Sequence, residues 1–545
     1  MSDRKIAAAL YVGCVLVYAL IAGQRLLAPS NDTHFVYQAQ SFLQRRLDLG
    51  RTPPHDNDWA MVETLTLRDG SKLEGQFLRQ TPDRFRLLSG RTRVVSPTEI
   101  SERSRKYYVS FPPFPAVVML PLVAIFGQRT NDVVFTVLLA GLVPALLFLL
   151  LRRLPAHLAG PASPDAAAEG PPGVGPFDLG ASLWLTALFA FGSVFFFSSV
   201  LGQVWFTAHI VSLVLCGLYL HALYAPLRPI VAGLCLAAMF LCRPQMAALL
   251  PLFVLEVLRR HHPRARYPRS LGEVWAILWG RPLALTDDPK DALREDGRPA
   301  TDDAASVPLL RRGSPWPALL SFAVASGFLA LLGLVHNSLR FGRALEFGHS
   351  YLTTMQADNI QRFGLINYQY LSRNLATALT LLPKLLPTAP YVQISYHGLA
   401  LWFTTPALLF LLWPESTVAM PEAMPEAMPE AMTDRVPPNY AATYRANAQV
   451  LRIALALCCV PIAGFALLYQ NTGYVQFGYR FSLDYMLPLV LLLALTQGHR
   501  LREPASPLGR LFRLCVVWGV LVNLFGAFTF SRFWQFYFNG FFPVG

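Results

Sequence analysis

Long apolar runs recur along the whole chain and constrain its fold more than any other feature. A helix of about 20 apolar residues spans the hydrocarbon core of a bilayer, and 54% of the 545 residues here are hydrophobic while 14% are charged. A mean hydropathy of +0.39 is too high for a soluble multidomain protein. The sequence predicts an all-α polytopic membrane protein with about eleven transmembrane helices, near residues 6–28, 131–151, 181–200, 206–224, 229–242, 245–258, 316–336, 398–413, 450–469, 485–498 and 512–530.

Basic residues between the runs predict the orientation of the chain, because loops rich in Arg and Lys stay on the cytoplasmic side. One path keeps every such loop inside, with a cytoplasmic N-terminus, a large outer loop over residues 29–130, and Phe533–Phe542 outside. The path requires the proline-containing segment Phe111–Gly127 to lie at the outer interface without crossing. The residues that set the orientation are Arg4, Lys5, Arg152, Arg153, Arg228, Arg259, Arg260, Arg264, Arg266, Arg269, Arg435, Arg445, Arg500 and Arg502.

The net charge of +13 follows from these loop arginines, so no nucleic-acid partner is expected. Six of the seven Cys lie inside apolar runs, Cys459 adjoins Cys458, and no CxxC or Cys/His metal spacing occurs. The cysteines therefore indicate neither disulfides nor a zinc site.

An insert over residues 56–102 interrupts the first outer loop. The segment MVETLTLRDGSKLEGQFL alternates apolar and polar residues around Asp69-Gly70, and a second turn follows at Ser89-Gly90. This pattern predicts a small β-rich module. Such a module is usually scaffold or interaction surface, and that interpretation is favoured over a chemical role. Compositions rich in Pro, Ala, Gly or charge predict flexible cytoplasmic loops at residues 155–176, 281–315 and 414–447.

Polar residues that adjoin the runs all fall on the outer side once the orientation is set. The orientation is set from the cytoplasmic arginines alone, so the shared location of these polar residues is independent of the way the orientation is chosen. Ionisable residues at the rim of a span are functional-site candidates by default, so the sequence predicts one polar cavity at the outer membrane boundary. The set comprises Asp32, His34, Lys106, Tyr107, Tyr108, Gln203, His209, Arg243, Asn337, Arg340, Arg343, Glu346, His349, Arg480 and Asp484.

The charge types in this set suggest a transferase whose donor is a sugar carried on a polyprenyl phosphate. Arg and Lys hold a phosphate and stabilise it as a leaving group, while a carboxylate removes the proton of an acceptor hydroxyl. No GxGxxG or P-loop occurs in the chain, which fits a donor that is not a nucleotide sugar. Asp32 is interpreted as the general base.

Several of these assignments have structural alternatives. Asp32 alternatively caps the helix that follows it. Asp48 is a second candidate base, although its position after Arg46 favours an exposed ion pair. Arg243 alternatively extends to the interface without binding phosphate, and Lys106 belongs to a generally basic loop.

The remaining alternatives concern residues near the other spans. Arg480 and Asp484, four positions apart at an expected helix start, alternatively form an i,i+4 pair. Hydrogen-bonded packing is favoured over a ligand role for His209 and His349.

Five motifs, taken in their order and spacing, resemble the GT-C glycosyltransferases, in particular bacterial members related to protein O-mannosyltransferases and to the aminoarabinose transferase that modifies lipid A. The resemblance covers most of the chain. Its carriers are Asn31-Asp32-Thr33-His34, the stretch from Lys106-Tyr107-Tyr108 to Phe111-Pro112-Pro113, FLCRPQ at Phe240–Gln245, HNSLRFGRALEFGHSY at His336–Tyr351, and FGYRFSLDYMLP at Phe477–Pro488.

The resemblance implies that Asp32 is the catalytic base and that transfer inverts the sugar carbon in one displacement. Candidates for contact with the donor phosphate are Lys106, Arg243 and Arg480. A divalent metal is possible, since some members use one, but the sequence offers no clear carboxylate set for it. Substrate positioning is assigned to Asn31, His34, Tyr108, His209, Arg340 and Glu346.

Two other functions compete with this prediction. A lipid or glycan transporter, or a flippase, would place its polar site near the bilayer midplane between internal repeats, and no repeat is detectable here. A cell-envelope assembly scaffold would need residues 56–102 but not Asp32. The sequence thus favours a glycosyltransferase of the bacterial inner (plasma) membrane with an extracytoplasmic active site. Its acceptor would be a lipid, a glycan or a protein.

Overall fold

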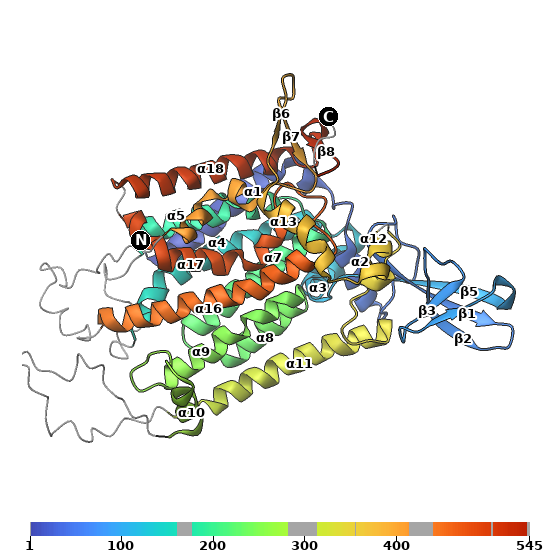
Figure 1. Ribbon diagram of the computed structural model, residues 1–545, viewed down its shortest axis with the longest axis horizontal. Helices are drawn as coiled ribbons and strands as arrows, with labels where there is room; N and C mark the ends of the chain where they lie inside the picture. The colour runs from blue at the N-terminus through green and yellow to red at the C-terminus, as the bar shows by residue number, and fades with distance from the viewer. Residues whose placement is uncertain are drawn as a thin grey trace, which may run out of the picture.

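The computed structural model describes residues 2–160, 177–281, 313–354, 356–413, 440–502 and 505–541. Long helices lie side by side along the longest axis of the molecule (Figure 1). Seven of the described helices are long and apolar enough to cross a membrane. They are α1 (Asp3–Ala22), α4 (Asp132–Leu158), α7 (Gln203–Tyr224), α11 (Trp316–Phe341), α16 (Tyr440–Leu468), α17 (Leu483–Arg502) and α18 (Pro507–Thr529).

The other apolar runs form shorter helical segments, and Gly or Pro stands at their interruptions. The run 181–200 divides beside Gly192, and the runs on either side of Pro244 separate there because proline lacks an amide N–H. The segments are α5 (Leu179–Ala190), α6 (Phe195–Ser199), α8 (Pro229–Phe240), η4 (Pro244–Leu249), α9 (Leu250–His261), α14 (Leu401–Thr404) and η7 (Pro406–Leu412). Each expected apolar run is therefore helical, whereas only seven described helices reach spanning length. The fold class, a polytopic helical membrane protein with a β-rich insert, is confirmed.

Helix α4 lies inside the bundle and packs against α1, α5 and α7. Leu147, Leu151 and Leu154 on α4 are fully or almost fully buried. Helix α1 can approach α4 closely because residue 141 is glycine. A Cβ at that position would lie only 2.5 Å from Val15 Cγ2. Small residues play this role widely where membrane helices approach closely.

The insert is a five-stranded antiparallel sheet in the order β4-β3-β2-β1-β5. It stands at the end of the bundle opposite the N-terminus (Figure 1). Gly70 and Gly90, at the expected turns, have φ of +81° and +89°, which glycine adopts without steric cost. The strands are β1 (Trp59–Leu67), β2 (Lys72–Phe77), β3 (Arg84–Leu87), β4 (Thr92–Val94) and β5 (Ile100–Val109).

The sheet extends past its expected limit at residue 102, because β5 pairs with β1 along its whole length, as far as Trp59 opposite Val109. Lys106 and Tyr108 consequently belong to the sheet. The module rests on the segment after α11, where Ala60 bridges Leu352.

Two short helices fill the corner between the module and the bundle, α2 (His34–Leu43) and α3 (Phe114–Phe126), and they pack against each other. Helix α3 corresponds to the segment expected at the outer interface, and its length is below that of a span. Both lie beside the module (Figure 1). The smaller elements are η1 (Gly23–Leu27), η3 (Gly127–Arg129), α10 (Leu271–Trp279), η5 (His349–Tyr351), α12 (Gln356–Phe363), α13 (Leu371–Leu379), η8 (Arg480–Ser482) and a sheet of β6 (Lys384–Leu385), β7 (Val392–Ser395) and β8 (Tyr537–Phe538).

The three expected flexible loops lie mostly outside the described residues. Their described edges are partly helical, since α4 continues to Leu158 and α16 begins at Tyr440. The expected outer tail is described only as far as Phe541.

Candidate functional site

Asp32 lies in the short connection between η1 and α2, only 8% exposed. One carboxylate oxygen, Oδ1, accepts a hydrogen bond from Asn57 Nδ2 at 3.0 Å, and His55 Nε2 lies 3.8 Å from the same oxygen. Burial raises the pKa of Asp32, while Asn57 and His55 act in the opposite direction. The cap position of α2 is occupied by Thr33, which makes no side-chain cap hydrogen bond. Asp32 is therefore not the helix cap.

Asp58 is a second buried carboxylate at this site, and sequence analysis missed it. Its Oδ2 accepts a hydrogen bond from Trp205 Nε1 at 2.9 Å, and its backbone has a φ of +56°. Burial raises the pKa of Asp58, the Trp205 bond and Arg480 lower it, and Asp32 raises it. The polar tetrapeptide His-Asp-Asn-Asp at 55–58, just before the first predicted strand, was the available signal. The entrance to the β-module thus supplies side chains to the Asp32 site.

His34 packs against the segment that carries Asn57 and Trp59. The ring is fully buried, stacks on Trp59 at 3.9 Å between centroids, and its Nε2 lies 2.9 Å from the Asn57 carbonyl oxygen. Burial lowers the pKa of His34 to about 4, so the ring is neutral at pH 7. This geometry gives His34 a packing role that helps to hold the segment carrying Asn57.

An ion pair between the buried Asp484 and the partly exposed Arg243 joins three helical segments near the carboxylates. Asp484, at the start of α17, accepts hydrogen bonds from Arg243 Nη2 at 2.8 Å and Nε at 3.2 Å. His209 Nδ1 on α7 lies 2.9 Å from Asp484 Oδ1, and Gln245 also donates to this carboxylate. The alternative pair between Asp484 and Arg480 is absent from the ion pairs of the described residues.

Arg480 is a buried cation whose surroundings differ from those of Arg243. Its side chain donates to the Val475 carbonyl oxygen at 3.1 Å, and its Nε has no hydrogen-bond partner among the described residues. The guanidinium lies over the rings of Phe206 at 5.2 Å and Trp205 at 5.9 Å. Trp205 therefore stands between Arg480 and Asp58, and it links the basic group to the acidic one.

His349 also belongs to this region. Its ring lies edge-on to Phe111 at 5.8 Å. Burial lowers the pKa of His349 to about 4, Glu346 opposes this shift, and Arg243 adds to it. The ring is therefore neutral at pH 7 beside the Arg243–Asp484 pair.

Other residues expected at the site have structural contacts instead. Arg340 donates to the Val109 carbonyl oxygen at 2.8 Å and so ties α11 to β5. Glu346 accepts hydrogen bonds from the loop amides of Gly348 and Ser350, at 2.7 and 3.3 Å. Tyr108 packs edge-on against Phe341 in the core beneath the module.

The two remaining expected residues lie at the surface. Lys106 is exposed on β5, opposite Val62. Asn31 is exposed as well, and its carbonyl oxygen lies 2.9 Å from His55 Nε2. Asp48 forms the expected exposed pair with Arg46, at 2.9 Å.

Asp132, at the start of α4, organises the connection that carries Asp32. Its carboxylate accepts hydrogen bonds from Ser30 N at 2.8 Å, Ser30 Oγ at 2.6 Å and Gln203 N at 2.8 Å. These bonds join the segment after α1 to the first residues of α4 and α7. Within the described residues, no group of three or more His, Cys, Asp or Glu side chains is arranged to hold a metal ion.

Comparison with known proteins gives matches among solved structures only. No protein-family model and no curated protein matches the sequence. Two structures from Archaeoglobus fulgidus match over 97% of this chain, at 11% identity and a TM-score of 0.34. One is an oligosaccharyltransferase tethered to an acceptor peptide containing the NVT sequon, and the other is the oligosaccharyltransferase AglB in complex with an inhibitory peptide and a dolichol-phosphate.

This chain spans about half the length of the solved structures it matches, covering 55% and 56% of them.

The Arg243–Asp484 pair predicts a measurable stability difference. We expect Asp484→Ala to lower the free energy of unfolding by about 3 kcal/mol, because it leaves a largely buried guanidinium without its carboxylate. Asp48→Ala, which breaks the exposed pair with Arg46, should cost less than about 1 kcal/mol. Unfolding of the detergent-solubilised protein in SDS measures both values. Equal losses in the two variants would contradict the assigned role of Asp484.

Proposed function

We propose that the protein is a GT-C-type glycosyltransferase, which transfers a sugar from a polyprenyl-phosphate donor to an acceptor hydroxyl at the outer face of the bacterial inner membrane. The observation that carries the proposal is the arrangement around Trp205. Its indole binds the buried Asp58 carboxylate and also lies against the buried Arg480 cation. Asp32, the proposed base, lies near enough to Asp58 to raise its pKa. A carboxylate that can take a proton from the acceptor and a guanidinium that can bind the donor phosphate thus occupy one end of the bundle.

Asp32 has the properties of a general base. Asn57 and His55 both approach Oδ1, whereas Oδ2 has no hydrogen-bond partner within the described part of the chain. That oxygen is available to accept the proton of an acceptor hydroxyl. Asp58 is less suited to this role because Trp205 occupies its Oδ2 and its Oδ1 is fully buried.

The basic group supports the departure of the donor phosphate. As the acceptor oxygen bonds to the anomeric carbon, the bond from that carbon to the phosphate oxygen breaks, and its electron pair leaves with the phosphate. A buried guanidinium stabilises this charge strongly because little water screens it. Arg480 is better placed for this than Arg243, whose charge is matched by Asp484. Inversion at the sugar carbon and a donor contact from Lys106 remain predictions.

The location of the site bears on the competing functions. The ionisable groups described above gather at the ends of α1, α4, α7, α8 and α17, beside the β-module, and not midway along the helices. A transporter site would be expected near the middle of the spans. A scaffold would not require a buried carboxylate with a free oxygen.

The first test concerns the base. Asp32→Asn keeps the shape of the side chain but cannot accept the proton, so sugar transfer should fall by about 10²- to 10⁴-fold. Transfer is measured as loss of radiolabelled sugar from the lipid donor and its appearance in cell-envelope acceptors. Asp69→Asn, in an exposed hairpin turn of the module, is the matched control and should keep full activity. Full activity in Asp32→Asn would refute the proposal.

The second test uses pH. Because burial raises the pKa of Asp32, the rate should decline below a pH that lies above the ordinary value for an aspartate. Asn57→Ala removes a hydrogen bond that stabilises the charged carboxylate, so the pKa should rise further. The acid limb of kcat/KM should then move upward by roughly one to two pH units. A limb that moves downward or stays in place would exclude Asp32 as the titrating base.

The third test concerns the donor. Arg480→Met keeps much of the side-chain volume but removes the charge, so affinity for undecaprenyl phosphate should fall at least about tenfold. Binding is measured by fluorescence quenching of the purified protein. Arg228→Met, at the other end of α7 and α8, is the control and should leave affinity unchanged. Equal affinity in wild type and Arg480→Met would return Arg480 to a packing role.

A further inference from the structure

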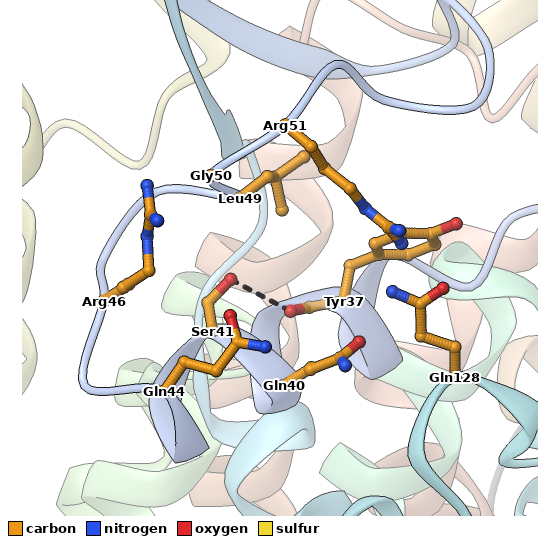
Figure 2. Close-up of a pocket in the computed structure, with 9 residues that line it drawn as sticks. All are labelled: Tyr37, Gln40, Ser41, Gln44, Arg46, Leu49, Gly50, Arg51 and Gln128. Carbon is orange, nitrogen blue, oxygen red and sulfur yellow. Dashed lines mark hydrogen bonds between the residues drawn. The ribbon is translucent and has the colours of Figure 1, made fainter.

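A cavity of about 220 Å³ lies along α2, on the side where η3 and the loop after α2 meet. Tyr37, Gln40 and Gln44 line it from α2 and its end, and Gln128 lines it from η3. Figure 2 shows the amide groups of Gln40 and Gln128 on either side of the space below the Tyr37 ring. Drug-sized ligands occupy pockets of about 300–1,000 Å³, so this cavity suits a single small ring.

The polar groups of the cavity suit hydroxyl ligands. The side-chain amides of Gln40, Gln44 and Gln128 make no hydrogen bond with any described residue. Each amide offers both donors and an acceptor, the combination that a sugar hydroxyl requires. Three such groups around one small space provide more directional contacts than a lipid tail or an apolar side chain could use.

The charged residues of the cavity are already engaged. Arg46 forms its ion pair with Asp48 at 2.9 Å. The Arg51 guanidinium lies over the Tyr37 ring at 4.7 Å, and Figure 2 shows the two side chains stacked along one wall. Arg51 keeps its positive charge in this contact, and the other free polar groups on the walls are neutral amides. The cavity therefore offers a ligand three amides and one guanidinium, a set that suits a ring bearing several hydroxyls.

Two buried rings lie between the cavity and the segment that carries the proposed base. Tyr37, which lines the cavity, lies edge-on to Trp59 at 5.6 Å, and Trp59 stacks on His34 at 3.9 Å. Along α2, His34 and Tyr37 are separated by a rise of about 4.5 Å, and Asp32 precedes this helix. An acceptor that extends from the cavity past these rings would reach the connection that carries Asp32.

We infer that this cavity is a carbohydrate subsite that holds one sugar unit of the acceptor. The inference rests on the proposed function, and it narrows the acceptor to a glycan or glycolipid. A protein hydroxyl would have no use for a subsite of this kind. The cavity would orient the acceptor, and Asp32 would act on the hydroxyl of the unit beyond it.

Binding to the full-length protein in detergent tests this inference without any transfer reaction. The probes are methyl α-D-glucopyranoside, methyl α-D-mannopyranoside and inorganic phosphate, each followed by saturation-transfer NMR. We expect saturable binding of at least one methyl glycoside at millimolar concentration, and weaker binding of phosphate. No saturable binding of either glycoside, or tighter binding of phosphate than of both glycosides, would overturn the inference.

Variants locate the binding. Gln40→Leu combined with Gln128→Leu should weaken glycoside binding at least tenfold, and should raise the KM for a glycan acceptor tenfold while kcat changes less than twofold. Gln369→Leu, at an exposed position outside the cavity, is the matched control. Unchanged binding in the double variant would refute the assignment.

The Asp32→Asn protein separates this inference from the proposed function. It should bind the glycoside as wild type does, because Asp32 is not part of the cavity. Glycoside binding in an Asp32→Asn protein that still transfers sugar would refute the proposed base alone. Loss of transfer in Asp32→Asn, together with no glycoside binding by wild type, would refute the carbohydrate subsite alone.

Discussion

The ion pair between Arg243 and the buried Asp484 is the interaction on which this end of the bundle, next to the β-module, depends. It joins the break between α8 and η4 to the start of α17, and His209 adds α7 to the same carboxylate. Removing two charges from water is costly, and the cost is offset only when both are closely paired and hydrogen-bonded. The pair therefore favours one arrangement of these helices. It also pairs the charge of Arg243, whereas the nearby buried guanidinium of Arg480 has no ion-pair partner among the described residues.

The β-module is joined to this arrangement through its root. Asp58 precedes β1 and binds Trp205 of α7, while Ser110 after β5 donates to the Asp58 carbonyl oxygen at 2.6 Å. Both ends of the insert are therefore held at the end of the helical bundle, near Asp32. The strands project from the bundle, as a scaffold would, but the segment that enters them contributes to the site. The module is thus linked to the proposed site by the chain itself and by the two hydrogen bonds that Asp58 accepts, from Trp205 and from Ser110.

The four carboxylates at this end of the bundle have different hydrogen-bond partners and therefore different roles. Asp132 is bound by backbone and hydroxyl donors, and Asp484 by basic and amide side chains. Asp58 and Asp32 each keep one oxygen without a hydrogen-bond partner in the described part of the chain, but that oxygen of Asp58 is fully buried, whereas Asp32 Oδ2 is not. The same region therefore contains carboxylates that hold the fold together and one that is free to exchange a proton.

Local patterns in the sequence were sufficient for much of this structure. The apolar runs predicted the helices, and the Asp69-Gly70 and Ser89-Gly90 turns predicted the hairpins, because both signals depend on neighbouring residues. The arginines of the short loops predicted that Asp32, Arg243 and Arg480 share one end of the bundle. The exposed ion pair of Arg46 and Asp48 could likewise be predicted, since the two residues are only two positions apart in the sequence.

Only the tertiary structure decided which of these groups pair. A local pair between Arg480 and Asp484 was one alternative in the sequence, yet Asp484 binds Arg243, a residue 241 positions away. Asp58 looked like part of a surface module, and the contact with Trp205 that buries it spans 147 positions. The sequence alone indicated which polar groups lie at the ends of the apolar helices. Their partners, and hence which charges remain free, follow from burial and helix packing, which no local pattern of residues records.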